Sequence, residues 1–241
     1  MVVPSSRGLS SPLERVGEHH CEQRLVASRK LTFVVEEARE GSAHPCTIAD
    51  IIRLLELLPE SDWAGLAGIV FRQPTHKQTL LAGAWGHLRY HAELRAKRGR
   101  LVVRGALIFL DAINADHRFE WSSALALADQ EELERLRTDG HAVERAGNRY
   151  IIHVTSESAR NTQLYRTLPH EIGHLFDWLE KVETPVAHGE DFSAAMERYF
   201  GRPRSEREAF AHRYADAARE RLLAGQRIPF ERQEEPGSPA L

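Results

Sequence analysis

The chain has 241 residues, of which 42% are hydrophobic and 28% are charged, with a formal net charge of −3. This composition is typical of a folded, water-soluble protein and excludes a chain that is disordered over most of its length. Because the net charge is small and the two signs are intermixed, we expect neither nucleic acid nor a membrane as a partner.

The sequence carries no sign of export. Nowhere do 18 uncharged apolar residues occur together, and residues 1–12 lack a basic segment followed by an apolar run. Cys21 and Cys46 are the only cysteines, too few for a disulfide framework or a cysteine-rich zinc site. These features predict a cytoplasmic location.

Both ends of the chain are predicted to be flexible tails. Residues 1–20 are rich in Ser, Pro and Gly, and residues 231–241 are polar and contain proline. Residues 21–230 between them are expected to form a single domain. Its first predicted helix runs through IADIIRLLELL, with Thr47 as its N-cap and Pro59 beyond its end.

The next part of the chain has the character of strands. Three apolar runs, at 66–71, 78–90 and 100–110, are separated by turns that contain Pro or Gly, which predicts a meander of antiparallel strands. A charged helix is expected at 129–140, followed by the alternating segment RYIIHV (149–154), which we expect as an edge strand. This sheet-rich half spans about residues 21–157.

From residue 158 onward the pattern is helical. One helix is predicted at about 158–183, and the helical part at 184–230 contains a short helix through DFSAAMERYF and a long one from Ser205 to about Leu223. Strands followed by helices predict the α+β class. Pro169 falls inside the first of these helices, where it costs a backbone hydrogen bond.

The segment His170-Glu171-Ile172-Gly173-His174 matches the pattern H-E-x-x-H. Residues four apart share one face of a helix, so both imidazoles can bind one metal ion. Glu171 lies about 100° further round, where it can act as a general base on a water molecule activated by that ion. The alternative is a pair of surface histidines on an amphipathic helix.

A catalytic zinc ion needs a third protein ligand and an open position for water. Asp177 and Glu180 stand where metzincin spacing requires glycine and histidine, which excludes that branch. Glu208 is the best remaining ligand, because it lies on a later helix that can fold back over the first. The small residues Ala211 and Ala215 would permit a close approach.

Alternatives to this assignment remain open at the level of sequence. Glu208 can instead complete a capping box with Ser205, and His188 in the segment PVAHGED is the reserve ligand. Asp177 is placed to orient His174 through its second ring nitrogen, or it is a surface carboxylate. The candidate donors for an oxyanion are Tyr214, His212, Tyr199 and His188.

HEIGHLFDW followed by EAFAHRYA resembles the gluzincin branch of the HExxH zinc metallopeptidases, or zincins. The resemblance covers these two motifs and not the sheet region. It implies a zincin-like α+β fold, in which a twisted, mostly antiparallel sheet lines the substrate cleft with an edge strand and a C-terminal helical subdomain carries the third ligand. It also implies that His170, His174 and Glu208 bind Zn²⁺ and that Glu171 is the catalytic base.

We therefore expect a zinc-dependent metallopeptidase or amide hydrolase that acts on a peptide or protein substrate. The alternative is a regulatory or binding protein that retains a metallopeptidase fold with little or no catalysis. In that case a fourth protein ligand, such as His188, would close the metal site. A third possibility is a metal-free helical scaffold.

Overall fold

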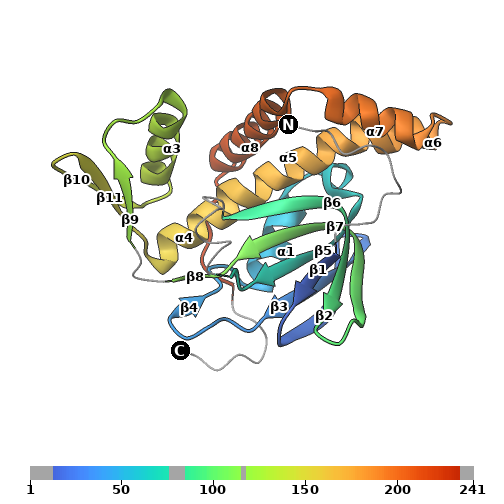
Figure 1. Ribbon diagram of the computed structural model, residues 1–241, viewed down its shortest axis with the longest axis horizontal. Coiled ribbons are helices and arrows are strands. Elements are labelled where there is room, and N and C mark those ends of the chain that lie inside the picture. The colour runs from blue at the N-terminus through green and yellow to red at the C-terminus, as the bar shows by residue number, and fades with distance from the viewer. Residues whose placement is uncertain (1–12, 76–84, 115–117, 234–241) are drawn as a thin grey trace.

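The computed structural model describes residues 13–75, 85–114 and 118–233, which form an α+β arrangement of a mixed sheet and several helices (Figure 1). The larger strands are β1 (Leu13–Val16), β2 (His19–Val26), β3 (Arg29–Glu36), β5 (Leu66–Arg72), β6 (Gly86–Ala96), β7 (Leu101–Asp111), β9 (Arg118–Ser122), β10 (Ala142–Ala146) and β11 (Arg149–His153). Two short strands, β4 (Ser42–Ala43) and β8 (Ile113–Asn114), pair with each other.

The α-helices among the described residues are α1 (Ile48–Leu57), α3 (Leu127–Thr138), α4 (Ser156–Thr162), α5 (Leu168–Trp178), α6 (Thr184–Ala187), α7 (Phe192–Gly201) and α8 (Arg204–Ala224). A 3-10 turn, η1, spans Glu60–Trp63, and two π turns span Gln163–Thr167 (η2) and Leu179–Glu183 (η3). In α1 the Thr47 side chain accepts from the Asp50 backbone, which confirms the predicted cap. No helix in these ranges has both the length and the apolar character needed to cross a bilayer.

The large sheet has the strand order β1-β6-β7-β5-β3-β2. Its β1–β6, β5–β7 and β3–β5 pairs are parallel, whereas β6–β7 and β2–β3 are antiparallel. The prediction of a mostly antiparallel sheet is therefore wrong, and so is the predicted meander, because β5 pairs with β7 and not with β6. Residues 78–84 of the predicted middle strand lie outside the described residues.

The physical reason lies in burial on both faces of the sheet. Every residue from Ala106 to Asp111 in β7 is buried, and β5 is buried over most of its length. Strands covered on both faces are near-continuous apolar runs, which is typical of parallel sheets. Such runs carry no alternation that would show which neighbour a strand pairs with.

The segment RYIIHV is not an edge strand of the main sheet. It forms β11, the central strand of a separate three-stranded sheet with the order β10-β11-β9. Helix α3 packs on this small sheet through Leu133 and Leu136, which contact Ile152. The two elements stand together at the left of Figure 1, apart from the large sheet.

Both predicted tails are shorter than expected, because part of each belongs to the folded domain. Within residues 1–20, the segment from Leu13 to Val16 forms β1, and Val16 is buried in the smaller core cluster of the large sheet. At the other end, the Gln233 backbone N–H donates to Asp50 Oδ1 over 2.9 Å. Residues 1–12 and 234–241 lie outside the described part of the chain.

The helix predicted at 158–183 is a continuous run from α4 to α6 that contains both π turns (Figure 1). Each π turn ends just before a proline: Pro169 follows η2, and Pro185 follows η3. A proline ring clashes with the carbonyl four residues back in a regular α-helix. The wider i→i+5 turn displaces that carbonyl, which explains how both prolines are accommodated.

Candidate metal centre

Two helices bring four possible metal-binding side chains together. His170 and His174 lie one turn apart on α5, and Glu208 and His212 lie one turn apart on α8. Because α5 and α8 pack against each other, the two pairs face one another. In Figure 1, α8 lies above α5, and β6 runs along the opposite side of α5.

Small residues set the distance between these helices. A Cβ atom added to Gly173 would lie 3.0 Å from the Cα atom of Ala211 and 3.0 Å from the Cβ atom of Tyr214. Ala211 and Ala215 are both buried, which confirms that they permit a close approach. The glycine of the motif therefore makes room for α8.

Two histidine nitrogens on α5 lie close to the same carboxylate oxygen on α8. The Nε2 atoms of His170 and His174 each lie 3.4 Å from Oε2 of Glu208. Nitrogen and oxygen ligands about 2.0–2.1 Å from a tetrahedral zinc ion lie about 3.3–3.4 Å from each other. These two separations therefore fit neighbouring ligands of one tetrahedral ion.

The charge states of the imidazoles also suit metal binding. Burial lowers the pKa of His170 to about 3, and the charges of His174 and His212 add to this effect. Burial also lowers the pKa values of His174 and His212. Neutral imidazoles form no ion pair with Glu208, and 3.4 Å is long for a hydrogen bond. Each ring therefore keeps a lone pair for a metal ion.

Glu208 remains an anion in this setting. Burial raises its pKa, but the hydrogen bond from Arg204 and the nearby histidines outweigh burial and lower it overall. The Nε–H group of Arg204 donates to Oε1 of Glu208 over 3.1 Å, which leaves Oε2 directed at the histidines. The capping-box alternative is wrong, because α8 begins at Arg204 after Pro203 and no side chain caps it.

Glu171 lies on the side of α5 that contacts β6. Its Oε2 atom accepts a hydrogen bond of 2.8 Å from the backbone N–H of Leu88, and the residue is 8% exposed. Burial raises the pKa of Glu171 to about 8, although the bond from Leu88 opposes this shift. Oε1 accepts no hydrogen bond within the described residues. The carboxyl group is thus anchored through one oxygen and available through the other.

His212 is a possible ligand that the sequence analysis named only as an oxyanion donor. The ligand atoms of His170, Glu208 and His212 all lie within 4.8 Å of one another. The rings of His170 and His212 are 4.5 Å apart between centroids. The i,i+4 spacing of Glu208 and His212 was the available signal, because it repeats the spacing of the two histidines on α5.

The other predicted site residues are engaged elsewhere. His188 is at the end of α6, where its Nδ1 atom binds the Thr184 carbonyl over 2.7 Å. Tyr214 donates to Asp62 over 2.6 Å, so it is not free to stabilise an oxyanion.

Tyr199 is buried, and its hydroxyl forms a hydrogen bond of 2.9 Å with the hydroxyl of Tyr90, so it is not free to stabilise an oxyanion. Asp177 is buried and accepts from Arg202 through Oδ2 over 2.8 Å, so the surface-carboxylate alternative is wrong. Its role in orienting His174 stays a prediction. Oδ1 of Asp177 and Nδ1 of His174 are both buried without a hydrogen-bond partner among the described residues.

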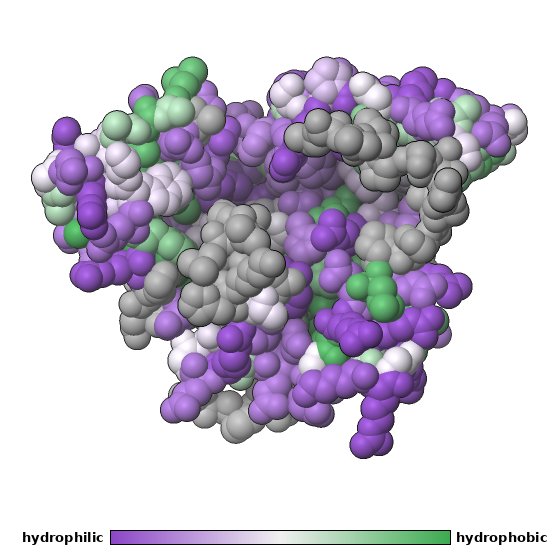
Figure 2. Space-filling model, viewed as in Figure 1, coloured by the Kyte–Doolittle hydropathy of each residue, from purple (hydrophilic) through white to green (hydrophobic). Residues whose placement is uncertain are grey.

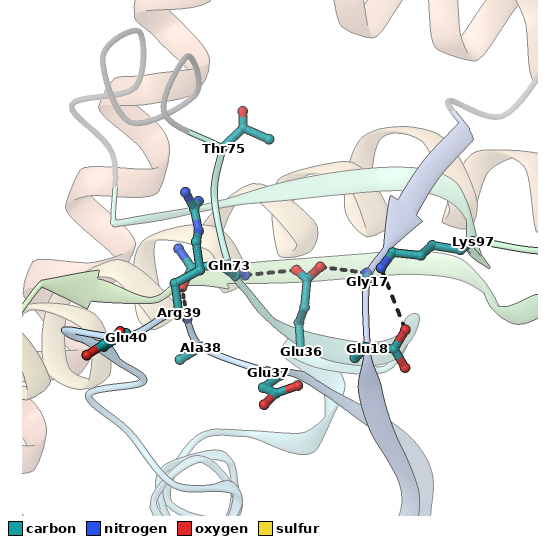
Figure 3. Close-up of a pocket in the computed structure, with 10 residues that line it drawn as sticks. All are labelled: Gly17, Glu18, Glu36, Glu37, Ala38, Arg39, Glu40, Gln73, Thr75 and Lys97. Atoms are coloured by element: carbon teal, nitrogen blue, oxygen red, sulfur yellow. Dashed lines mark hydrogen bonds and ion pairs between the residues drawn. The ribbon is translucent and has the colours of Figure 1, made fainter.

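The molecular surface is hollowed where α5, α8 and β6 meet, and the visible part of this hollow is lined by hydrophilic residues (Figure 2). A separate open groove lies beside β2 and β3 (Figure 3). Its central carboxylate, Glu36, accepts backbone N–H groups from Gly17 and Gln73 with its two oxygens. These bonds join residues that follow β1 and β5 to the end of β3, so we assign Glu36 a structural role.

Comparisons with protein-family models, with curated proteins and with solved structures found no match to this chain. Its function is therefore inferred from the residues of the site.

Proposed function

We propose that the protein is a zinc-dependent peptidase or related amide hydrolase in which His170, His174 and Glu208 bind the ion. The observation that carries this proposal is the pair of 3.4 Å separations between the two Nε2 atoms and one carboxylate oxygen. Two neutral imidazoles and one carboxylate are a common ligand set of catalytic zinc sites. A purely structural zinc ion has no use for a base at position 171.

Zinc held by His170, His174 and Glu208 would lower the pKa of a water molecule and polarise the carbonyl under attack. Its positive charge would also favour the ionised form of Glu171. The Glu171 carboxylate would take the proton of the attacking water on Oε1 and pass it to the leaving nitrogen. The bond from Leu88 holds Oε2, so the carboxylate keeps its orientation during both transfers.

Strand β6 supports a peptide as the substrate. Its partner β1 is paired only with residues 93–96, so the first half of β6 has no strand on that side within the described residues. The Leu88 N–H in this half already contacts the proposed base. A peptide could extend the sheet along this edge.

Metal content measured by elemental analysis tests the proposal. We expect about one zinc per wild-type chain, loss of zinc in His174→Ala and weaker binding in Glu208→Gln. Glu171→Gln should retain zinc and lose hydrolysis. The matched control is His188→Ala, which should bind zinc like the wild type. Wild-type protein that stays free of zinc after zinc is supplied would refute the proposal.

The position of His212 favours a second candidate function. If its imidazole is a fourth ligand, the site is closed and the protein is a regulatory or binding protein without catalysis. X-ray absorption of the zinc-loaded protein would count the ligands. In the hydrolase, His212→Ala leaves one zinc per chain, and the absorption spectrum keeps the same number of histidines. In the closed site, the spectrum of His212→Ala has one histidine fewer.

A further inference from the structure

Arg207 is a cation next to the proposed metal centre, directly before Glu208 on α8. Its guanidinium carbon lies 5.6 Å from the ring centroid of Tyr199 and 5.2 Å from that of Phe200, both on α7. A guanidinium stacked on aromatic rings is held in place while its N–H groups remain able to bind a planar anion. The side chain is thus positioned before any ligand arrives.

Arg207 has no acidic partner in the described part of the chain, in contrast to its neighbours. Arg202 pairs with Asp177 at 2.8 Å, and Arg204 pairs with Glu208 at 3.1 Å. The Nε atom of Arg207 is buried without a hydrogen-bond partner. Arg207 as a whole is half-buried, and its terminal nitrogens form no hydrogen bond with the described residues.

Arg207 lies close to β6 through its contact with α7. The Tyr199 ring on which Arg207 stacks has its hydroxyl 2.9 Å from the hydroxyl of Tyr90. The Arg207 charge also opposes the rise in the pKa of Tyr90 that burial causes. Tyr90 is on β6 and stacks on Trp178 of α5 at 4.6 Å between ring centroids. Arg207 therefore lies on the α7 side of the centre, close to the strand proposed to bind the peptide.

Arg207 leaves an unpaired positive charge in this region. A zinc ion held by two neutral imidazoles and the Glu208 carboxylate would carry one net positive charge, which the Glu171 carboxylate balances. The positive charge of Arg207 has no acidic partner among the described residues. Opposite charges attract strongly at a partly desolvated site, so an anionic group of a ligand would be stabilised here.

We propose that Arg207 binds a carboxylate of the substrate on the α7 side of the scissile bond. The enzyme would then prefer peptides that have either a C-terminal carboxylate or an acidic side chain at this position. This inference rests on the proposed hydrolase function. It assigns to Arg207 a role in specificity, separate from the zinc ligands and the base.

The test uses three dipeptide hydroxamates, which bind to zinc through the hydroxamate group. The first ends in a carboxylate and the second in a carboxamide. The third ends in a carboxamide and has a glutamate side chain in place of glutamine. Their dissociation constants are measured by calorimetry with zinc-loaded wild type, Arg207→Gln, Arg207→Lys and the control Arg213→Gln. Arg213 is exposed on the same helix.

We expect at least one carboxylate-bearing probe to bind wild type about tenfold or more tightly than the plain carboxamide. The preferred probe identifies a terminal carboxylate or an acidic side chain as the source. The preference should disappear in Arg207→Gln, decrease in Arg207→Lys and persist in Arg213→Gln. A purely structural role for Arg207 would lower thermal stability and leave the preference unchanged.

Two results overturn the inference: equal binding of all three probes by zinc-loaded wild type, or a preference that survives in Arg207→Gln. Zinc analysis before the titration separates this failure from failure of the proposed function. Wild-type protein that binds no zinc would remove the basis of both proposals, whereas zinc-loaded protein without a carboxylate preference would overturn only this one.

Discussion

Gly173→Ala tests the packing that brings the two helices of the metal centre together. The added Cβ atom would lie 3.0 Å from carbon atoms of Ala211 and Tyr214, whereas carbon atoms in favourable contact are about 3.5–4.0 Å apart. Both contacts are to atoms at or next to the backbone, so α8 must move. Overpacking lowers the free energy of unfolding by about 1–3 kcal/mol, and replacing glycine by alanine within a helix raises it by about 1 kcal/mol. We expect a net loss of about 1 kcal/mol, the middle of the resulting range.

Thermal unfolding of the metal-free protein measures this loss, and about 2–4 °C per kcal/mol is expected for a chain of this size. The same displacement moves Glu208, so zinc affinity should fall about tenfold. Gly201→Ala is the matched control, because Gly201 is on α7 and no atom lies within 4 Å of its added Cβ. A Gly173→Ala protein with wild-type stability and zinc affinity would refute this account of the helix contact.

Three further predictions concern residues outside the metal centre. Arg160→Ala leaves the Asp50 carboxylate buried without its bidentate partner, so the free energy of unfolding in urea should fall by about 3–5 kcal/mol. Tyr214→Phe removes the hydrogen bond to Asp62, which should cost about 1–2 kcal/mol and leave zinc content unchanged. Burial, with nearby arginines, lowers the pKa of His87 to about 3, so the unfolded chain binds its proton first as pH falls from about 6.5. Wild type should therefore lose up to about 1.4 kcal/mol per pH unit relative to His87→Phe between these values.

Each of these predictions has a result that would contradict it. Full stability of Arg160→Ala would mean that the buried pair contributes little. Loss of zinc in Tyr214→Phe would place that hydroxyl in the metal centre. For His87, parallel pH profiles of the variant and wild type would show that its ring is protonated equally in the folded and unfolded states.

Local features of this protein were predictable from sequence. The cap at Thr47, the ends of α1 and the positions of α3, α7 and α8 follow from residues within one or two turns of each other. The spacing of His170 and His174 on one face of a helix is equally local. The assignment of Glu208 as a ligand needed two non-local arguments. These were the resemblance to gluzincins and the expectation that a later helix folds back over the first.

The tertiary structure alone decided the order of strands and the composition of the site. Strands β5 and β7 are buried on both faces, so their sequences do not show which edges pair. His212 joins the cluster because two small residues, Gly173 and Ala211, let α8 approach α5 closely. Helix patterns repeat within a few residues, whereas strand pairing and helix contacts join residues far apart in the chain. For that reason the sequence by itself determined the motif at 170–174, and only the tertiary structure decided that α8 and β6 lie on either side of it.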